Sequence, residues 1–209
     1  MRAITVSVDY ADLLKYTLPR NALHFDEVLV VTAPKDDETR AVVECVPNAR
    51  SMTTEAFYEN GATFNKGAAM ELGFDILGRE GWICIFDADT LLPDVVEWPT
   101  EPGHIYSPRR RMCVAPERDL EAAVTGKWDA FPVCPDGEPA GYCQVFHASD
   151  PAIATARPWY GTHWDDARGC DSTFNRHWTT TRWKWLAWQV CHLGQHRVNW
   201  GGRVSPRVA

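Results

Sequence analysis

The sequence lacks any long run of apolar residues. Its longest runs are short, such as the five residues Trp82–Phe86, whereas a membrane-spanning helix needs roughly 20. The N-terminus also lacks the apolar stretch of a signal peptide, because Asp9 and Asp12 lie where that stretch would be. We therefore expect a protein that neither enters a membrane nor is exported, and that works in the cytoplasm.

An excess of positive charge is lacking as well. The chain has 21 Lys and Arg against 28 Asp and Glu, which gives a formal net charge of −7. This balance argues against a protein that binds nucleic acid mainly by neutralising phosphates. The run Arg109–Arg111 is the one candidate that we single out for a local basic patch.

Closely spaced cysteine pairs are also missing. The seven cysteines form no CxxC, and the nearest two, Cys134 and Cys143, are nine positions apart. Neither a zinc ribbon nor a thioredoxin-type redox site is therefore supported. Reduced and mostly buried thiols fit this pattern better.

What is present is the pattern of an α/β domain. The chain has 209 residues, 45% of them hydrophobic, which is enough for one domain with a core of its own. Apolar strands alternate with helical patterns, and this order predicts a parallel sheet covered by helices. The expected strands are Ala3–Val8, Glu27–Thr32, Ala41–Cys45 and Trp82–Phe86, and the expected helices run from Leu13 to about Pro19 and from Asn65 to Leu77.

Residues 99–139 differ from the first part of the chain. They hold seven of the fourteen prolines, so we expect an irregular excursion across the mouth of the sheet, with one short helix near Pro116–Val124. Seven of the ten tryptophans follow residue 158, and core packing explains them more plainly than ring platforms for a sugar or a base. Regular structure is expected again in the strands Tyr142–His147 and Trp185–Cys191 and in a helix from Asp171 to Trp178.

Acidic residues follow three of the predicted strands, at Asp9, at Asp36 and Asp37, and at Asp87 and Asp89. The carboxyl ends of parallel strands meet at one edge, where ligands bind, so these residues are expected in one crevice. The side chains of Asp87 and Asp89 point the same way if the segment is extended. Two such carboxylates suit Mg²⁺ or Mn²⁺ that also binds a diphosphate. For an Asp-x-Asp taken alone, an ordinary turn is the alternative.

Six segments of the chain resemble segments of GT-A glycosyltransferases, and they occur in the same order as in that family. The central one, IFDADTLLP, resembles the DxD segment with which this family binds a metal and a nucleotide-sugar. The resemblance implies the GT-A fold, a Rossmann-like mixed α/β sheet flanked by helices, in a single domain with a nucleotide-sugar-binding half over residues 1–95 and an acceptor-binding half over residues 96–209. The other segments are TVSVDY with VVTAPKDDET, then FNKG, GYCQVFH, CDSTF, and HLG with NWGGR.

A metal ion is the cofactor that this resemblance implies, either Mn²⁺ or Mg²⁺. Asp89 and His192 match the family's metal ligands, and Asp87 matches a residue that contacts the ribose, the metal or both. A metal there neutralises the diphosphate as the sugar–oxygen bond breaks. Without the resemblance, His192 would be interpreted as a core histidine at the end of a strand.

Further residues are implied to bind the nucleotide-sugar. Lys66 matches a residue that reaches the diphosphate or the base, and a solvated position at a helix start is its alternative. Asp37 matches an acceptor for a uracil N–H, and an ordinary turn residue is the alternative. Arg197 could replace a lysine that some relatives have where this chain has Val198, or it could be a surface residue. Val8, Tyr10 and Asn65 complete the implied nucleotide-sugar site.

Transfer of a sugar to a hydroxyl with inversion needs a general base. Asp171 is the candidate, since it matches the family's EDxDF segment, although Cys170 replaces the usual acidic residue before it. Asp166 is the reserve. An N-cap of the helix that it starts is an equally good interpretation of Asp171, and retention of configuration would remove the need for a base.

The leading hypothesis is a metal-dependent glycosyltransferase that uses a UDP-sugar. A sugar-phosphate nucleotidyltransferase is an alternative, although TVSVDYADLL has no glycine for a phosphate loop. A non-catalytic nucleotide- or sugar-binding domain is another. In size the chain resembles viral and bacterial enzymes that glycosylate hydroxymethylated bases in DNA beside TET-type dioxygenases, which would place it in a bacterium or a phage-infected host. DNA containing hydroxymethylcytosine, a small molecule, a glycan and a protein are the acceptors left open.

Overall fold

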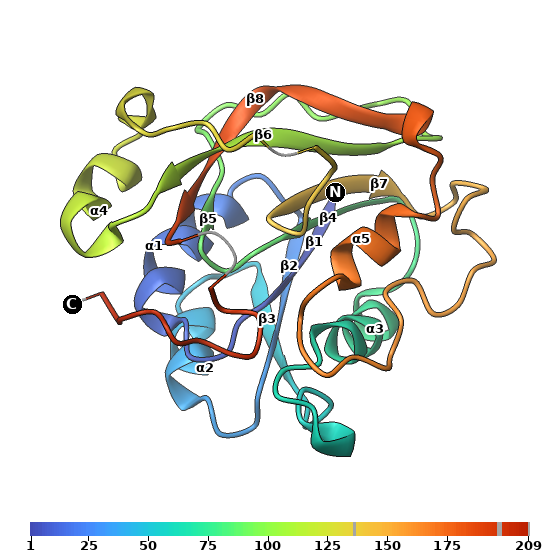
Figure 1. The fold of residues 1–209 in the computed structure, drawn as a ribbon, viewed down its shortest axis with the longest axis horizontal. Helices are drawn as coiled ribbons and strands as arrows, with labels where there is room; N and C mark the ends of the chain where they lie inside the picture. Colours follow the sequence, from blue (N-terminus) through green and yellow to red (C-terminus); the bar gives the residue numbers. More distant parts are fainter. Residues whose placement is uncertain (136, 196–197, 209) are drawn as a thin grey trace.

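One mixed sheet runs through the whole protein (Figure 1). The computed structural model describes residues 1–135, 137–195 and 198–208, and its eight strands lie in the order β3-β2-β1-β4-β7-β6-β8-β5. The strands are β1 Arg2–Val6, β2 Glu27–Thr32, β3 Ala49–Thr53, β4 Trp82–Phe86, β5 Thr90–Leu91, β6 Ile105–Cys113, β7 Cys143–His147 and β8 Trp183–Leu193. The α-helices are α1 Ala11–Ala22, α2 Asp37–Glu44, α3 Lys66–Leu77, α4 Pro116–Val124 and α5 Cys170–Asn175, and 3₁₀ turns span Glu59–Gly61, Trp128–Ala130 and Thr180–Arg182.

The first four strands of that order are parallel, as the sequence predicts. β1 pairs with β2 on one side and β4 on the other, and β2 pairs with β3. Alternate residues pack on opposite faces: Ala3 and Val30 share a core with α1 and α2, while Ile4 and Leu29 share one with α3 and α5. Figure 1 shows these two pairs of helices on the two sides of the sheet. Burial on both faces explains why the strands are continuously apolar.

The other half of the sheet is largely antiparallel. β7 pairs antiparallel with both β4 and β6, whereas β6 and β8 run parallel. The two-residue strand β5 pairs antiparallel with β8, and Thr90 lies opposite His192. This last pairing ties the segment that follows β4 to the last strand of the chain.

The expectation of an irregular excursion over residues 99–139 is wrong in part. This region contains β6, a nine-residue strand, in addition to the expected helix α4. Pro108 lies where the register between β6 and β8 shifts, between Ser107 and Arg109. Because the ladder is interrupted there, the missing N–H of a proline is tolerated.

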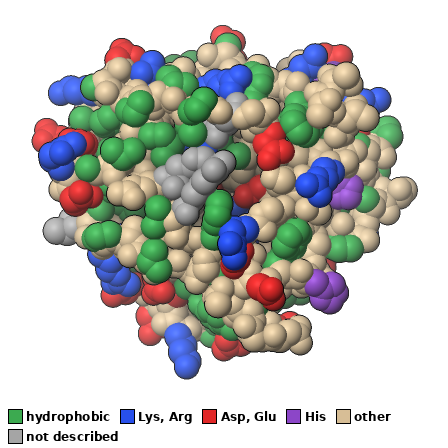
Figure 2. Space-filling view, in the orientation of Figure 1, with side chains coloured by type: hydrophobic (Ala, Val, Ile, Leu, Met, Phe, Trp, Pro, Cys, Tyr) green, Lys and Arg blue, Asp and Glu red, His purple; other side chains and the backbone are tan. Residues whose placement is uncertain are grey.

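The arginine triplet lies in β6 and does not form an open basic patch. The Arg109 guanidinium stacks over the Trp185 ring at 3.6 Å from its centroid, and Arg110 is 5% exposed. Arg111 donates to Gln189 Oε1 and to the backbone oxygen of Phe131. On the face shown in Figure 2, charges of both signs are interspersed.

The expected strand over Ala41–Cys45 is also wrong, because these residues lie in and just after α2. The side chain of Asp36 accepts a hydrogen bond from Thr39 N and so caps the helix at its start. Val43 is buried on the core side of α2. Val43, one of the apolar residues that suggested a strand, is therefore buried by helical spacing instead.

Pro19 does not end the first helix, contrary to our expectation, and α1 continues to Ala22. Tertiary hydrogen bonds hold its last turn. Buried Asn21 donates to Thr90 O and accepts from Leu92 N, and Thr17 Oγ1 donates to Ala88 O. These contacts also fix the segment on either side of Asp89.

The remaining predicted elements are confirmed with small changes. α3 ends at Leu77 as expected, α4 has the predicted bounds, and β7 and β8 occupy the predicted places. α5 is shorter than expected and ends at Asn175. Of the helices in the described ranges, none is long and apolar enough to cross a membrane.

Replacement of Asp36 by Ala should destabilise the protein by about 2–4 kcal/mol. Its carboxylate is buried and also accepts from Asp9 N at 2.8 Å and from Thr39 Oγ1 at 2.7 Å, so it joins the end of β1 to the start of α2. Urea denaturation measures the loss.

Asp37 provides the matched control. Its side chain is 83% exposed and pairs with Arg40, so Asp37→Ala should change the free energy of unfolding by less than about 0.5 kcal/mol. Equal losses in the two variants would contradict the role assigned to Asp36.

Candidate active site

A cavity of about 970 Å³ lies at the carboxyl ends of β1 and β4. Of the acidic residues expected in one crevice, Asp87 and Asp89 line it, whereas Asp9, Asp36 and Asp37 do not. Segments from both halves of the chain line it. Among the residues singled out from the sequence, its wall includes Val8, Tyr10, Lys66, Asp87, Asp89, Asp171 and His192.

Three potential metal ligands meet in this cavity, and β-pairing brings them together. Asp87 and Asp89 directly follow β4, and Asp87 N donates to Tyr142 O. His192 arrives on β8, because Leu193 N donates to Asp89 O at 2.7 Å and β5 pairs with β8. One ligand atom from each of Asp87, Asp89 and His192 lies within 4.8 Å of the others.

The chemistry of these three side chains fits a divalent cation. His192 Nε2 lies 3.5 Å from Asp89 Oδ1, and both side chains are 9% exposed. The buried Nδ1 of His192 has no hydrogen-bond partner among the described residues, which is unusual for a histidine that only fills a core. Burial, together with the charge of Asp87, raises the pKa of Asp89. Two carboxylates and an imidazole form a donor set suited to Mn²⁺ and related ions.

Lys66 lies between two carboxylates. Asn65 caps α3 by accepting from Ala68 N, which places Lys66 as the first helical residue. Its ammonium Nζ is 2.9 Å from Asp87 Oδ1 and 3.2 Å from Asp171 Oδ1. Burial opposes the charge, yet Asp171 and Asp87 together raise the pKa of Lys66. Lys66 is therefore not a solvated residue at a helix start.

The same contact controls Asp87. Burial favours its neutral form, but the adjacent ammonium of Lys66 outweighs this and lowers the pKa of Asp87. Asp87 is thus held as a carboxylate beside Asp89, whose pKa is shifted in the opposite direction.

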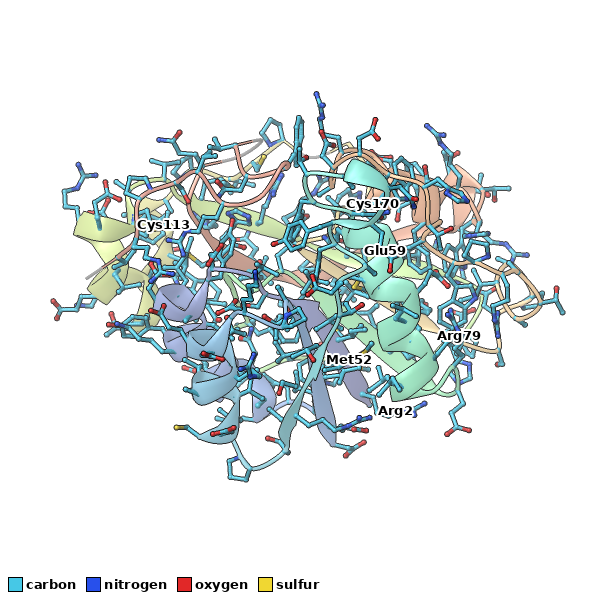
Figure 3. All side chains as sticks on the ribbon, turned by 90° about the horizontal axis from the view of Figure 1, so that it is seen from below. Arg2, Met52, Glu59, Arg79, Cys113 and Cys170 are labelled. Carbon is cyan, nitrogen blue, oxygen red and sulfur yellow. The ribbon has the colours of Figure 1, made fainter. Side chains whose placement is uncertain are left out.

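Asp171 faces the cavity and does not cap α5. The N-cap of α5 is Gly169, in a left-handed conformation at φ 80°, and Asp171 is the second helical residue. Its carboxylate accepts from Lys66 and lies beside Cys170 Sγ, with no hydrogen bond from a backbone N–H in the described part of the chain. Burial raises the pKa of Asp171 even though Lys66 opposes the shift. Figure 3 labels Cys170, which directly precedes Asp171 and lies near one end of α3. Arg79 is labelled near the other end of that helix.

Sequence reasoning missed Arg203, which lines the cavity and supports Tyr10. Its guanidinium lies 4.6 Å from the centroid of the Tyr10 ring and forms a two-pronged ion pair with Asp12. Burial and the nearby charge of Asp89 raise the pKa of Tyr10. The signal available in the sequence was a lone Arg in the segment NWGGR, which gives no hint of its partners.

Arg110 of the arginine triplet also lines the cavity, whereas Asn65, Asp37 and Asp166 do not. Asn65, besides capping α3, donates to Thr162 O, and exposed Asp37 pairs with Arg40. Asp166 pairs with Arg168 at 2.6 Å. Arg197 falls outside the described residues.

Comparisons with known proteins give a fold and no family. No family model matches the chain, and no curated protein matches it. Glucosyl-3-phosphoglycerate synthase from Mycobacterium tuberculosis, in complex with phosphoglyceric acid, aligns with a TM-score of 0.51 at 14% identity, over 95% of this chain and 72% of that one. Mannosyl-3-phosphoglycerate synthase from Rubrobacter xylanophilus aligns with a TM-score of 0.48 at 17% identity, over 94% and 67%.

A third solved structure, described as a mycobacterial protein, aligns with a TM-score of 0.43 at 16% identity over 71% of this chain. The chain spans about half of its length, 53%. At these identities the likeness concerns the fold. The mixed α/β sheet with its Asp-x-Asp after β4 is the GT-A fold of nucleotide-diphospho-sugar transferases.

Proposed function

We propose that this protein is a metal-dependent glycosyltransferase that moves a sugar from a nucleotide-sugar, with UDP as the nucleotide, to a hydroxyl group. The observation that carries the proposal is the meeting of Asp87, Asp89 and His192 at one point of a large cavity, beside the Lys66–Asp171 pair. The GT-A fold supports it, because in open α/β sheets ligands bind at the carboxyl ends of the strands.

The three ligands would hold Mn²⁺ or Mg²⁺. A divalent cation bound there supplies charge neutralisation for the diphosphate leaving group. Lys66 holds Asp87 as a carboxylate, and Tyr10, supported by Arg203, offers a ring on the nucleotide side. Each of these groups is in place before the donor binds, so little reorganisation is needed.

Asp171 is the proposed general base. It lies on the other side of the Lys66 ammonium from Asp87, with its carboxylate facing the cavity. A base there would take the proton of the acceptor hydroxyl as that oxygen attacks the sugar, which corresponds to inversion. Asp166 is the weaker candidate, because Arg168 occupies its carboxylate.

The acceptor is proposed only as a hydroxyl compound. The arginine triplet, which favoured DNA at the level of sequence, is engaged within the sheet. Hydroxymethylcytosine DNA therefore belongs in an acceptor panel beside phosphorylated small molecules, glycans and proteins. Mass spectrometry of the products separates these classes and also the alternative activity: a glycosyltransferase releases UDP, whereas a nucleotidyltransferase releases pyrophosphate.

Asp89→Asn should abolish metal-dependent binding of UDP, because a neutral amide is a much poorer ligand for Mn²⁺ than a carboxylate. His192→Ala should weaken the same step, and Mn²⁺ should act better than Mg²⁺, since an imidazole suits the softer ion. Calorimetry with UDP, with and without Mn²⁺, measures both effects.

Asp129→Asn is the control for loss of one negative charge, because its side chain is fully exposed. It should bind UDP and Mn²⁺ like the original protein. If UDP binds equally tightly in chelator and to both site variants, the shared metal site is wrong and the proposed function fails with it.

Asp171→Asn should lower turnover by about 10²–10⁴-fold, because the amide keeps the size of the side chain but accepts no proton. Affinity for the donor should change little, whereas loss of the ion pair with buried Lys66 should lower the melting temperature. Steady-state kinetics beside Asp166→Asn tests the choice of base: a large loss in the Asp166 variant, with the Asp171 variant active, would reverse the assignment.

A further inference from the structure

The carboxylate of Asp171 packs directly against the backbone of Gly141. A Cβ atom built on Gly141 would lie less than 3.0 Å from Cγ and both oxygens of Asp171, closer than real Cβ atoms approach. The φ of Gly141 lies outside the left-handed region. A Cβ at this position would therefore displace the carboxylate, whereas the backbone conformation itself does not need glycine.

A chain of buried polar groups joins α5, which carries Asp171, to the segment that carries Gly141. The Tyr160 hydroxyl donates its single proton to Gln144 Oε1 at 2.5 Å. Gln144 Nε2 in turn donates to Asn175 Oδ1 at 2.8 Å, and Asn175 Nδ2 donates to Pro139 O. Tyr160, Gln144 and Asn175 are all 0% exposed.

This chain fixes both partners of the Gly141–Asp171 contact. Asn175 and Asp171 lie on α5, and Pro139 lies two residues before Gly141. The Tyr160 ring stacks on Phe174 with centroids 4.7 Å apart, which holds its hydroxyl in place. The carboxylate is thus confined by Gly141 on one side and by the Lys66 ammonium at 3.2 Å, on a helix that the buried network holds in place.

We propose that Gly141 and Tyr160 are positioning residues that hold the Asp171 carboxylate in the orientation from which it takes the proton of the acceptor. The inference rests on the proposed function, since it concerns the base of that reaction. A base displaced by about 1 Å costs on the order of 10²-fold in rate. Confinement of this carboxylate then sets kcat, while donor binding depends on the metal ligands and Tyr10.

Gly141→Ala should therefore lower kcat by about 10²-fold and leave the KM for the donor and metal-dependent UDP binding unchanged. Gly137→Ala is a control for the added methyl group, because a Cβ there meets nothing within 4 Å and its φ lies outside the left-handed region. Because Gly137 also lines the cavity, the KM for the acceptor is measured for both variants. Tyr160→Phe should lower kcat by about tenfold or more, because it leaves the buried Gln144 Oε1 without its donor and loosens the network that fixes α5.

A double-mutant cycle separates positioning from a general loss of structure. In an Asp171→Ala background, Gly141→Ala and Tyr160→Phe should cause no further loss of kcat, because the group that they position is gone. If Gly141→Ala alone fails to fold, the double variant Gly141→Ala, Asp171→Ala should fold, since the clash is with the removed carboxylate.

The outcomes separate this inference from the proposed function. If the unmodified protein transfers sugar and Gly141→Ala leaves kcat unchanged, the positioning role is wrong and the proposed function stands. Additive losses in the Asp171→Ala background overturn it too, because they assign Gly141 and Tyr160 a structural role. If the unmodified protein transfers no sugar from any donor, the proposed function is wrong, and so is the positioning role that rests on it.

Discussion

The ammonium of Lys66 joins two carboxylates that come from distant parts of the chain, 21 and 105 residues away from it. Burial of charge costs several kcal/mol per ion, and a partner within hydrogen-bonding distance repays much of this cost. Loss of the ammonium would leave Asp87 and Asp171 facing each other inside the protein. The contact therefore holds α5 and the end of β4 in one fixed arrangement around the start of α3.

Much of the parallel half of the fold could be predicted, because its signals are local. Apolar β-branched runs predict β1, β2 and β4, and Asn65 followed by helical spacing predicts α3. Strand order predicts the placement of Asp87 and Asp89 at the cavity, although the same argument wrongly placed Asp9, Asp36 and Asp37 there. By contrast, the contact of Lys66 with Asp171 and the approach of His192 depend on tertiary pairing. No local pattern encodes the pairing of the two-residue strand β5 with β8.

The errors share a physical cause, which is that tertiary contacts override local preference. Pro19 costs α1 one backbone hydrogen bond, but Asn21 bonds both Thr90 and Leu92 and keeps the last turn in place. The arginine run in β6 looks like a basic patch only while its partners are unknown. In the fold, Trp185 on β8 covers Arg109 and removes it from the expected role.

The balance of charge in the cavity links the metal to the donor. Asp87, Asp89 and Asp171 line the cavity, and an anionic diphosphate beside them is repelled unless a counter-charge is close. Of the arginines that also line it, Arg168 pairs with Asp166, Arg203 pairs with Asp12, and Arg110 lies over the Tyr142 ring. Lys66 is already engaged by two of these carboxylates, so it neutralises a diphosphate only weakly. A divalent cation held by Asp89 and His192 would supply the missing charge at the place where the diphosphate must lie. Lys66 is used to hold Asp87 and Asp171 in place. Under the proposed function, donor binding therefore depends on the metal.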